Sequence, residues 1–315
     1  MFDIACVGII VADVIAKPVD SLPEKGLLGQ VGSIRLLNGG NAMTAAVNCS
    51  KLGLSSAMLG KIGGDAFGGF LKGVLSENKV NIDGLAVDKN AQTAASVALV
   101  GSDGERTFLH CVGADGTFSI DDVNWGIIEK SKLVFLTGSF LMDKFDGAQT
   151  VGFLKRCKET GKTTALDVCW DSRGRWGELL NHALPYVDIF LPSIDEARKL
   201  TGADALDEIS ERLIGAGVKT AVIKLGKNGC YIRENKNTPG YAVRACLEDI
   251  KPVDTTGAGD SFCSGFLTAY IKGMDLQDCA RFANAAGAIS VTRQGATTGI
   301  ESYNQVYNLM KEDYL

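Results

Sequence analysis

The chain has 315 residues, of which 46% are hydrophobic and 22% are charged, and its net charge at pH 7 is −5. These values are typical of a globular protein with one large core, and the negative charge with only 7% aromatic residues argues against a nucleic-acid-binding surface. Nine scattered cysteines without a C-x-x-C pair predict free thiols in a reducing cytoplasm.

The N-terminal segment MFDIACVGIIVADVIA predicts a buried strand over residues 3–12. It has no basic leading region, and Asp3 and Asp13 interrupt it, so it lacks the pattern of a targeting signal. No stretch of the sequence has the length and apolarity expected of a membrane span. Because a buried strand rarely ends in an acid that has no partner, we expect Asp13 to bind a polar group.

The next hundred residues predict two kinds of structure. A glycine turn and small-residue helix (38–53), a strand (55–63) and a helix (67–80) follow one another as in an α/β protein. Residues 14–36 look extended and turn-rich, and residues 93–112 read as two strands around a Ser-Asp-Gly turn. We expect these last two segments to pair into a small separate sheet, like a lid.

From about residue 120 onward, helices and strands alternate. The predicted helices are 121–130, 146–160, 194–201, 206–216, 259–272, 276–291 and 302–312. The predicted strands are 132–138, 163–168, 187–193 and 220–226, followed by an antiparallel pair at 230–234 and 241–245. This alternation predicts one α/β domain over residues 1–315, with three αβα layers around a mostly parallel sheet. Such sheets bind ligands beyond the C-terminal ends of their strands.

The sequence argues against two common nucleotide-binding motifs. Gly161-Lys162-Thr163 matches the end of a Walker A loop, but it lies between a predicted helix and a strand, which is the reverse of the order that motif needs. We interpret Gly161 as a glycine that ends a helix. The first strand, CVGIIVADV, lacks the dinucleotide fingerprint, which argues against a Rossmann-type dehydrogenase.

The segment DTTGAGDSF, residues 254–262, combines a flexible turn, a helix start and two acids. Backbone N–H groups of Gly257, Ala258 and Gly259 can converge there without side chains in the way, and the helix N-terminus adds partial positive charge. This is an anion hole that suits a phosphate. Asp260 lies beside it and can act as a general base; taken alone, it is equally consistent with a helix-capping acid. The two glycines and the second acid, Asp254, favour the functional interpretation.

This segment resembles the C-terminal signature of the phosphofructokinase-B type carbohydrate kinases, the ribokinase-like family. Residues 38–68 resemble the N-terminal signature of that family, KLGKNG (224–229) its nucleotide-binding strand and turn, and 283–296 its adenine-pocket helix and loop. The resemblance extends from the first strand to about residue 300. It implies a ribokinase-like fold with a β-sheet lid.

The resemblance also implies an activity, the ATP-dependent phosphorylation of a small sugar or sugar-like alcohol, and roles for particular residues. Asp260 is implied as the base, and the amides of Gly257, Ala258 and Gly259 as the hole for the transferred phosphate. The implied sugar ligands are Asp13, Gly39, Gly40 and Asn41. The implied nucleotide-binding residues are Lys224, Gly226, Gly229, Thr256, Gly257, Asn284 and Ser193.

Glu196 is implied to organise Mg²⁺ through water. Asp254 and the Thr256 backbone resemble positions that bind a monovalent cation, such as K⁺, in some members; a turn-stabilising acid is equally consistent with Asp254.

Several positions depart from the family pattern and leave the substrate open. Thr44 replaces an Asn that usually touches the sugar, and Ser193 replaces the Asn of Asn-x-x-Glu. Residues 166–176 lack Asp-Pro-Asn-x-Arg and offer Arg173, which either meets an anionic substrate group or is a solvated loop residue. Arg106 and His110, on the expected lid, are further candidates to reach the sugar.

The alternatives are an adenosine-like nucleoside as substrate, or a non-catalytic sugar- or nucleotide-binding protein. The presence of Asp260 disfavours the latter. We expect neither nucleic acid nor membrane as a partner. The free edges of a lid sheet make a homodimer through the lid a further prediction.

Overall fold

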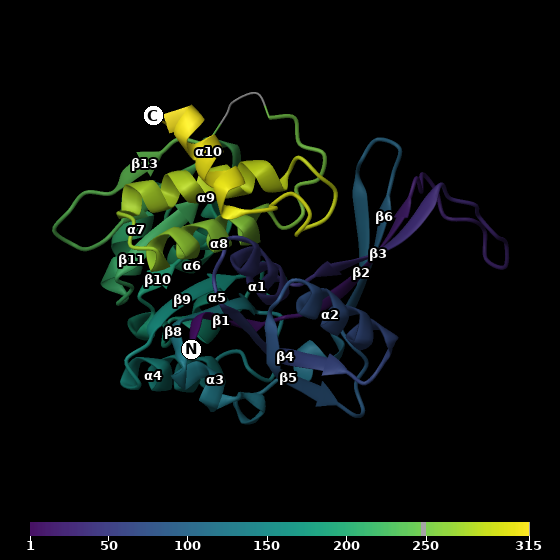
Figure 1. The fold of residues 1–315 in the computed structure, drawn as a ribbon, viewed down its shortest axis with the longest axis horizontal. Helices are drawn as coiled ribbons and strands as arrows, with labels where there is room; N and C mark the ends of the chain where they lie inside the picture. The colour runs from purple at the N-terminus through teal and green to yellow at the C-terminus, as the bar shows by residue number, and fades with distance from the viewer. Residues whose placement is uncertain (247–249, 315) are drawn as a thin grey trace.

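The computed structural model describes residues 1–246 and 250–314 as three layers, with a nine-stranded sheet between two sets of helices (Figure 1). The strand order is β13-β12-β11-β10-β9-β8-β1-β4-β5. The strands are β1 (Phe2–Gly8), β4 (Ser56–Gly63), β5 (Asn81–Asp88), β8 (Ser131–Ser139), β9 (Thr163–Val168), β10 (Ile189–Phe190), β11 (Thr220–Lys224), β12 (Cys230–Arg233) and β13 (Tyr241–Val243). Among the described strands of this sheet, β12 pairs antiparallel with both β11 and β13, and the other neighbours pair parallel; the antiparallel β12–β13 pair was predicted. The mostly parallel α/β fold is therefore confirmed.

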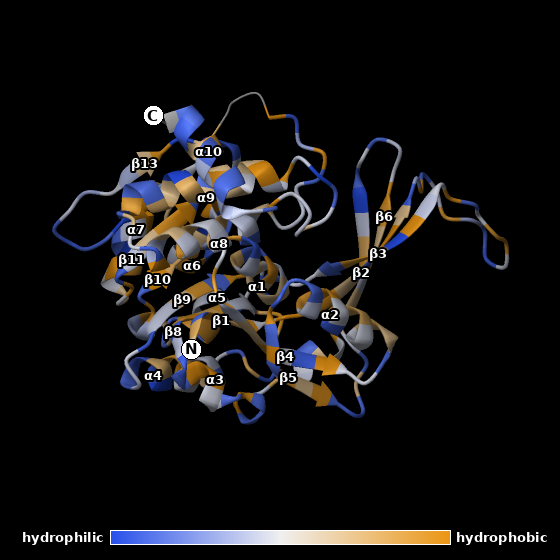
Figure 2. Ribbon diagram, in the orientation of Figure 1, coloured by the Kyte–Doolittle hydropathy of each residue, from blue (hydrophilic) through white to orange (hydrophobic). Residues whose placement is uncertain are grey.

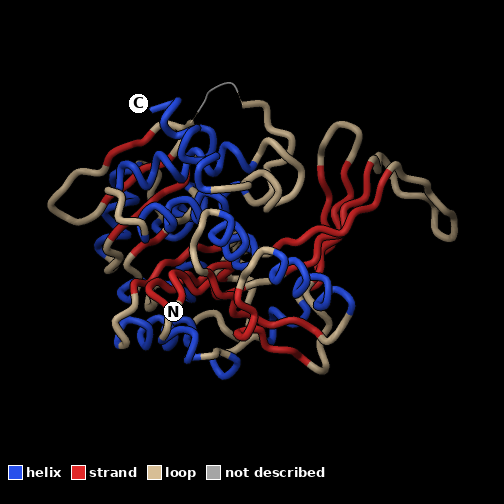
Figure 3. The backbone as a smooth tube through the Cα atoms, in the orientation of Figure 1, coloured by secondary structure: helices blue, strands red, loops and turns tan. Residues whose placement is uncertain are grey.

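The helices cover both faces of this sheet (Figure 3). One face carries α1 (Asn41–Lys51), α2 (Ala66–Glu77), α8 (Ala258–Ile271), α9 (Leu276–Ser290) and α10 (Tyr303–Tyr314). The other carries α3 (Trp125–Glu129), α4 (Ala148–Glu159), α5 (Trp176–Leu180), α6 (Ile194–Thr201) and α7 (Leu206–Gly215). Side chains of β1 alternate between the two cores: Ile4 and Cys6 enter the first, and Ala5 and Val7 the second. This is why the strand reads as a continuous apolar run.

A second sheet of four strands, which we call the lid, projects from one end of the body (Figure 1). Its strands are β2 (Val11–Lys17), β3 (Ser33–Gly39), β6 (Ala95–Val100) and β7 (Arg106–Cys111), in the order β3-β2-β6-β7. The predicted lid segments 14–36 and 93–112 therefore do form a small separate sheet.

The prediction of one strand over residues 3–12 is wrong. The chain leaves the large sheet at Gly8 and enters the lid at Val11. Gly8 has φ 143°, and a side chain there would clash with the carbonyl oxygen of Thr137 on β8. Only glycine permits this bend, and Asp13 consequently lies within a lid strand and not at the end of the first central strand.

Most of the other elements lie where the pattern predicts them. The α4 helix ends at Glu159, Gly161 has φ 74°, and β9 begins at Thr163, which confirms the helix-ending interpretation of Gly161. The strand β5 and the short helix α5 were not predicted. Among the described residues, no helix combines the length and apolarity needed to cross a membrane.

Candidate active site

The start of α8 forms a tip of free amides at the C-terminal edge of the sheet. Gly257 caps the helix in the left-handed conformation, with φ 75°. Within the described part of the chain, the N–H groups of Gly257, Gly259 and Asp260 donate to no protein group, whereas that of Ala258 donates to the Thr255 carbonyl oxygen at 3.2 Å. Of the three amides predicted to form an anion hole, those of Gly257 and Gly259 are thus free, and the neighbouring Asp260 amide is free as well. Three unpartnered amides at a helix tip fit an anionic oxygen.

Asp260 lies half-buried beside this tip, in the first turn of α8. Asn41, the first residue of α1, donates its side-chain N–H to Oδ1 of Asp260 at 2.7 Å. Burial raises the pKa of Asp260 to about 6, although the positive charge of Lys224 and the Asn41 hydrogen bond oppose the shift. A carboxylate with this pKa is mostly ionised at neutral pH yet still basic enough to accept a proton from a hydroxyl.

Lys224, at the end of β11, lies directly behind the tip. Its Nζ is 3.5 Å from the position that a Cβ on Gly259 would occupy. It also lies 2.8 and 2.9 Å from the two carboxylate oxygens of Asp167, which is 1% exposed at the end of β9. Burial alone would lower the pKa of Lys224, but the charge of Asp167 raises it well above its usual value. Lys224 is therefore a fixed positive charge beneath the amides, and Asp167 is a site residue that was not predicted.

The glycine pair at residues 39 and 40 shapes the opposite wall. A side chain on Gly39 would meet the carboxylate of Asp13, so glycine lets β3 pass close to Asp13 on β2 without displacing it. Gly40 has φ 86° and caps α1, which directs Asn41 toward Asp260. Burial raises the pKa of Asp13 to about 6, opposed by a hydrogen bond with Ser96 and increased by the charge of Asp254. This turn brings the predicted sugar-binding residues to the same end of the sheet.

The lid reaches the loop before α8 through Arg106. Its guanidinium pairs with Asp254 at 2.8 Å and donates to the Thr256 hydroxyl. Asp254 also accepts the N–H groups of Thr256 (2.9 Å) and Gly295 (3.0 Å). Although burial raises the pKa of Asp254, these hydrogen bonds and the Arg106 charge hold it below its usual value. Asp254 thus stabilises the turn, which was one of its two predicted roles.

These contacts border a cleft of 460 Å³ between the lid and the body, lined by residues that include Asp13, Arg106, Phe108, Asp254 and Thr256. A second contact spans it, because Lys17 on β2 donates to the side-chain oxygen of Gln294 at 3.2 Å. The lid is therefore held against the loops that precede and follow the two helices α8 and α9.

The residues predicted to bind nucleotide and Mg²⁺ lie on the other side of the tip. Ser193 and Glu196 form a reciprocal cap of α6, with the Ser193 N–H 2.7 Å from Glu196 Oε2. Burial and the charge of Asp167 raise the pKa of Glu196. Within the described part of the chain, Glu196 forms no ion pair, and a carboxylate of this kind can hold a divalent cation through water.

On that side, Gly229 and Asn284 have structural partners, whereas Gly226 borders open space. A side chain on Gly229 would clash with the Val243 carbonyl oxygen, so this glycine lets β12 and β13 pass closely. Asn284 donates to the Arg244 carbonyl oxygen at 2.7 Å. Gly226 has φ 57° and open space around it, where a planar group has room. No described contact ties these residues to the tip of α8, so their roles stay predictions.

Thr44 and Arg173 lie away from the cleft, and His110 lies on the lid beside Ser96, which also contacts Asp13. Thr44 is 1% exposed in the core of α1, and its hydroxyl has no partner, so it does not face the cleft. Nδ1 of His110 and the hydroxyl of Ser96 form a hydrogen bond of 3.0 Å on the lid. Arg173 pairs with Asp143 at 2.7 Å on a loop where its side chain is 59% exposed, which supports the solvated-loop interpretation.

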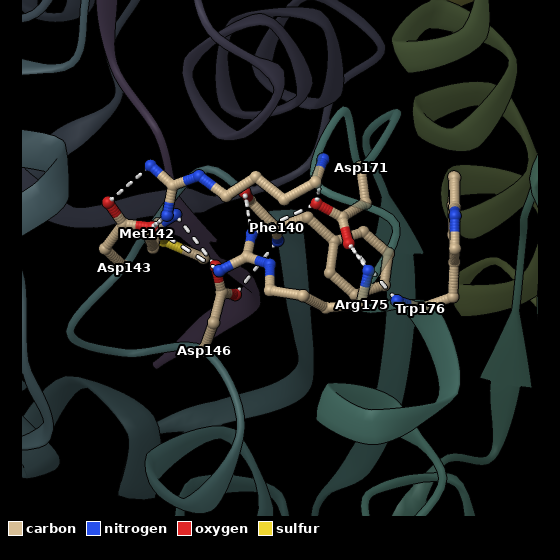
Figure 4. Close-up of polar contacts among 8 residues, drawn as sticks. Phe140, Met142, Asp143, Asp146, Asp171, Arg175 and Trp176 are labelled. Carbon is tan, nitrogen blue, oxygen red and sulfur yellow. Dashed lines mark hydrogen bonds and ion pairs between the residues drawn. The ribbon is translucent and has the colours of Figure 1, made fainter.

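Figure 4 shows the polar contacts of the loops after β8 and β9. Asp146 accepts the N–H groups of Phe140 and Met142, both at 3.0 Å. Asp171 accepts the Trp176 N–H at 3.2 Å and pairs with Arg175 at 3.1 Å. Arg175 also donates to the Phe140 carbonyl oxygen at 3.2 Å, so the charged residues of this segment stabilise the two loops against each other.

The comparisons with known proteins agree with this architecture. The pfkB family carbohydrate kinase model matches residues 1–302, and the chain belongs to that family. It is 31% identical over 313 residues to a protein named probable fructokinase-7 from Arabidopsis thaliana, covering 93% of this chain and 90% of that one. The structure of Arabidopsis thaliana ribokinase complexed with ribose and ATP has a TM-score of 0.85, at 26% identity, and covers 98% of this chain and 99% of that chain. An E. coli putative ribokinase II, in complex with ATP and Mg²⁺, has a TM-score of 0.85 at 21% identity, covering 99% and 100%.

The fold is thus the ribokinase-like α/β fold, and the protein is a carbohydrate kinase of this family.

Proposed function

We propose that this carbohydrate kinase transfers the γ-phosphoryl group of ATP to a hydroxyl of a small sugar or sugar-like alcohol, with Asp260 as the general base. The observation that supports this is the pairing of a carboxylate of pKa about 6 with three unpartnered amides at one helix tip. The amides suit the charge that develops on a transferring phosphoryl group, and the carboxylate suits the departing proton.

The proposed reaction uses these groups in the following order. The acceptor hydroxyl lies against Asp13 and the Gly39-Gly40 turn, within reach of Asp260. Asp260 accepts its proton while the hydroxyl oxygen attacks the γ-phosphorus, and the bond to the leaving oxygen of ADP breaks. The amides of Gly257, Gly259 and Asp260, with Lys224 behind them, stabilise the charge on the transferred group. When Mg²⁺ is bound, it neutralises phosphate charge, and Glu196 would hold it through water.

The remaining ligand assignments complete the proposal. Lys224, Gly226, Gly229, Thr256, Asn284 and Ser193 would line the path of the nucleotide. A monovalent cation such as K⁺ would bind at the backbone of Thr256 beside Asp254, whose carboxylate is already paired with Arg106. Arg106, which borders the cleft, would meet the acceptor or the transferred phosphate.

A nucleoside acceptor is the second candidate, and one observation favours it. Phe108 lines the cleft and is 57% exposed, so its ring has a free face on which a base can stack. A sugar-sensing protein without catalysis fits less well, because a base of suitable pKa is retained.

The test is ADP release by the purified protein with ATP, Mg²⁺ and a panel of hexoses, pentoses, sugar acids and nucleosides. We expect at least one compound to increase ADP formation far above the rate with ATP alone. Turnover of nucleosides only would select the second candidate. No turnover with any compound, from protein shown to bind ATP, would exclude the kinase assignment for these classes.

The pH dependence of kcat follows from Asp260. Since its pKa is raised to about 6, the reactive ionised form is complete above that pH and is lost as the pH falls through it. We expect kcat at saturating acceptor to fall about tenfold per pH unit below this value. Asp13 has a similar pKa, so the profile is repeated with Asp13→Asn. A profile that is flat down to about pH 4.5, well below the value for Asp260, would contradict the assigned base.

We also propose a cytoplasmic homodimer that pairs through the lid. All nine cysteines are free thiols, which suits a reducing compartment. The lid exposes apolar side chains such as Ile34 (68%) and Leu109 (64%), and the orange patches on its strands are visible in Figure 2. Sedimentation velocity should show a dimer that Leu109→Asp shifts toward monomer; a wild-type monomer at micromolar concentration would refute the proposal.

A further inference from the structure

The side chain of Asn41 lies between the carboxylate of Asp260 and the thiol of Cys169. Its Nδ2 is 2.7 Å from Asp260 Oδ1, and its Oδ1 is 3.2 Å from Cys169 Sγ. The three residues come from separate elements: Asn41 opens α1, Asp260 lies in the first turn of α8, and Cys169 directly follows β9. The Cys169 N–H donates to the Ser139 carbonyl oxygen at 3.0 Å, which fixes the thiol relative to β8.

The chemistry of the three groups sets the direction of both hydrogen bonds. An ionised carboxylate can only accept, so the amide nitrogen of Asn41 must face Asp260 and the amide oxygen must face Cys169. The thiol is then the donor. Burial raises the pKa of the Cys169 thiol well above its usual value, and the negative charges of Asp167 and Asp260 raise it further. Cys169 therefore keeps its proton at neutral pH, as a donor must, and is a poor nucleophile.

Asn41 contacts one oxygen of Asp260 and leaves the other without a described partner. The remaining groups facing this carboxylate are charged: Lys224 from β11 and Glu196 from α6, with Asp167 paired to Lys224. The second thiol of the cluster, Cys263, contacts Asp167 and Lys224 and does not bond to Asn41. Asn41 is thus the neutral donor that sets the orientation of the base, and Cys169 is the group that sets the orientation of Asn41.

We propose that Cys169 and Asn41 are positioning residues, which hold Oδ1 of Asp260 so that Oδ2 faces the acceptor hydroxyl. The proposal deepens the proposed function and rests on Asp260 as the base. Without the thiol, the Asn41 amide loses one of its two side-chain contacts and can tilt, which weakens the hydrogen bond that it donates to Oδ1 of Asp260. A weaker hydrogen bond to the ionised form makes Asp260 harder to ionise.

The experiment compares Cys169→Ala, Cys169→Ser and Asn41→Ala with the wild type. Serine keeps a donor at this position, whereas alanine removes it. Cys157→Ala is the matched control, because Cys157 is a buried thiol in α4, within the core cluster against which Cys169 packs, and has no described contact with Asn41. We expect Cys169→Ala to lower kcat about three- to tenfold, with little change in the KM for ATP, and Asn41→Ala to lower it further. Cys169→Ser should return to within about twofold of the wild type, because its hydroxyl restores the hydrogen bond.

Two readouts separate positioning from a merely structural effect. The acid limb of kcat should move to higher pH in Cys169→Ala and Asn41→Ala, and stay in place in Cys169→Ser and Cys157→Ala. The pKa of Asp260 is measured directly by ¹³C NMR of protein labelled at aspartate carboxyls, with the signal assigned by its loss in Asp260→Asn. This second measurement needs no turnover, so it decides the positioning even if no acceptor is found.

An Asp260 pKa that is unchanged in Cys169→Ala would overturn the proposal, as would equal behaviour of Cys169→Ser and Cys169→Ala. If Cys169→Ala does not fold, Cys169→Ser and Asn41→Ala are compared. A raised Asp260 pKa in Asn41→Ala alone agrees with the proposed positioning, and an unchanged pKa in both variants refutes it.

Discussion

Asp260→Asn should lower kcat by about a hundredfold or more while leaving ATP binding largely intact. Asparagine has nearly the same shape, and its oxygen can still accept the 2.7 Å hydrogen bond from Asn41. It cannot take a proton from the acceptor hydroxyl. The amides at the tip of α8 and the charge of Lys224 are unchanged, so phosphate binding should persist. The measurement is steady-state kinetics with the best acceptor, combined with ATP calorimetry.

A matched control tests the view that Asp260 only caps a helix. Asp278 occupies the same place in α9 that Asp260 has in α8, the third residue of the helix, and pairs with Arg281 at 3.0 Å. Asp278→Asn removes an acid from the first turn of a helix whose N-terminus is capped by the Asp275 side chain, which accepts the Asp278 N–H. It should change stability by less than about 1 kcal/mol and leave kcat within about twofold. If the two variants behave alike, Asp260 is a capping acid and the proposed mechanism fails.

The chemistry of the site could be predicted from local sequence because one short segment builds most of it. Gly257, Gly259 and Asp260 are neighbours, and glycine conformation with helix polarity places the amides and the acid together. The same logic explains Asn41, since the Gly39-Gly40 turn directs the first residue of α1. These features depend on the backbone conformation of a few consecutive residues, which the local sequence determines.

Contacts between distant segments were harder to predict. The Lys224–Asp167 pair joins the ends of β11 and β9, which lie on either side of β10. The alternation of helices and strands along the sequence does not show that these two strands are close, because it does not fix the strand order. One signal existed: Asp167 ends a buried strand, and such an acid needs a partner. The same argument was applied to Asp13 but was attached to the wrong strand.

The error in the first strand has a specific cause. Residues 4–12 are uniformly apolar because β1 is buried on both faces and the start of β2 is also buried, so hydrophobic periodicity shows no boundary between them. The bend depends on Gly8 passing the Thr137 carbonyl oxygen, a contact with a segment that is more than a hundred residues away. A single glycine in a strand pattern indicates such an approach only weakly.

Gly257→Ala should be the second variant with a large effect, lowering kcat by about a hundredfold through displacement of the amides. Gly257 has φ 75°, and its added Cβ would lie 2.5 Å from Cβ and 2.9 Å from Cα of Ala296. Either the tip of α8 or the loop that carries Ala296 must move. That loop also supplies the Gly295 N–H to Asp254, so the movement reaches the turn that Arg106 holds.

Gly273→Ala separates the crowding from the backbone strain. Gly273 follows the other end of the same helix with φ 82°, and nothing lies within 4 Å of an added Cβ. Alanine at this position has the strain of the left-handed conformation but no steric clash. It should lower the free energy of unfolding by about 1 kcal/mol and leave kcat unchanged. Urea unfolding measures the stability of both variants, and kinetics at saturating substrates measures kcat. If Gly257→Ala loses no more activity than Gly273→Ala, the tip tolerates displacement and its amides do not stabilise the transferred phosphate. If it loses activity well beyond any difference in folded fraction, then the position of those amides is what the glycine preserves.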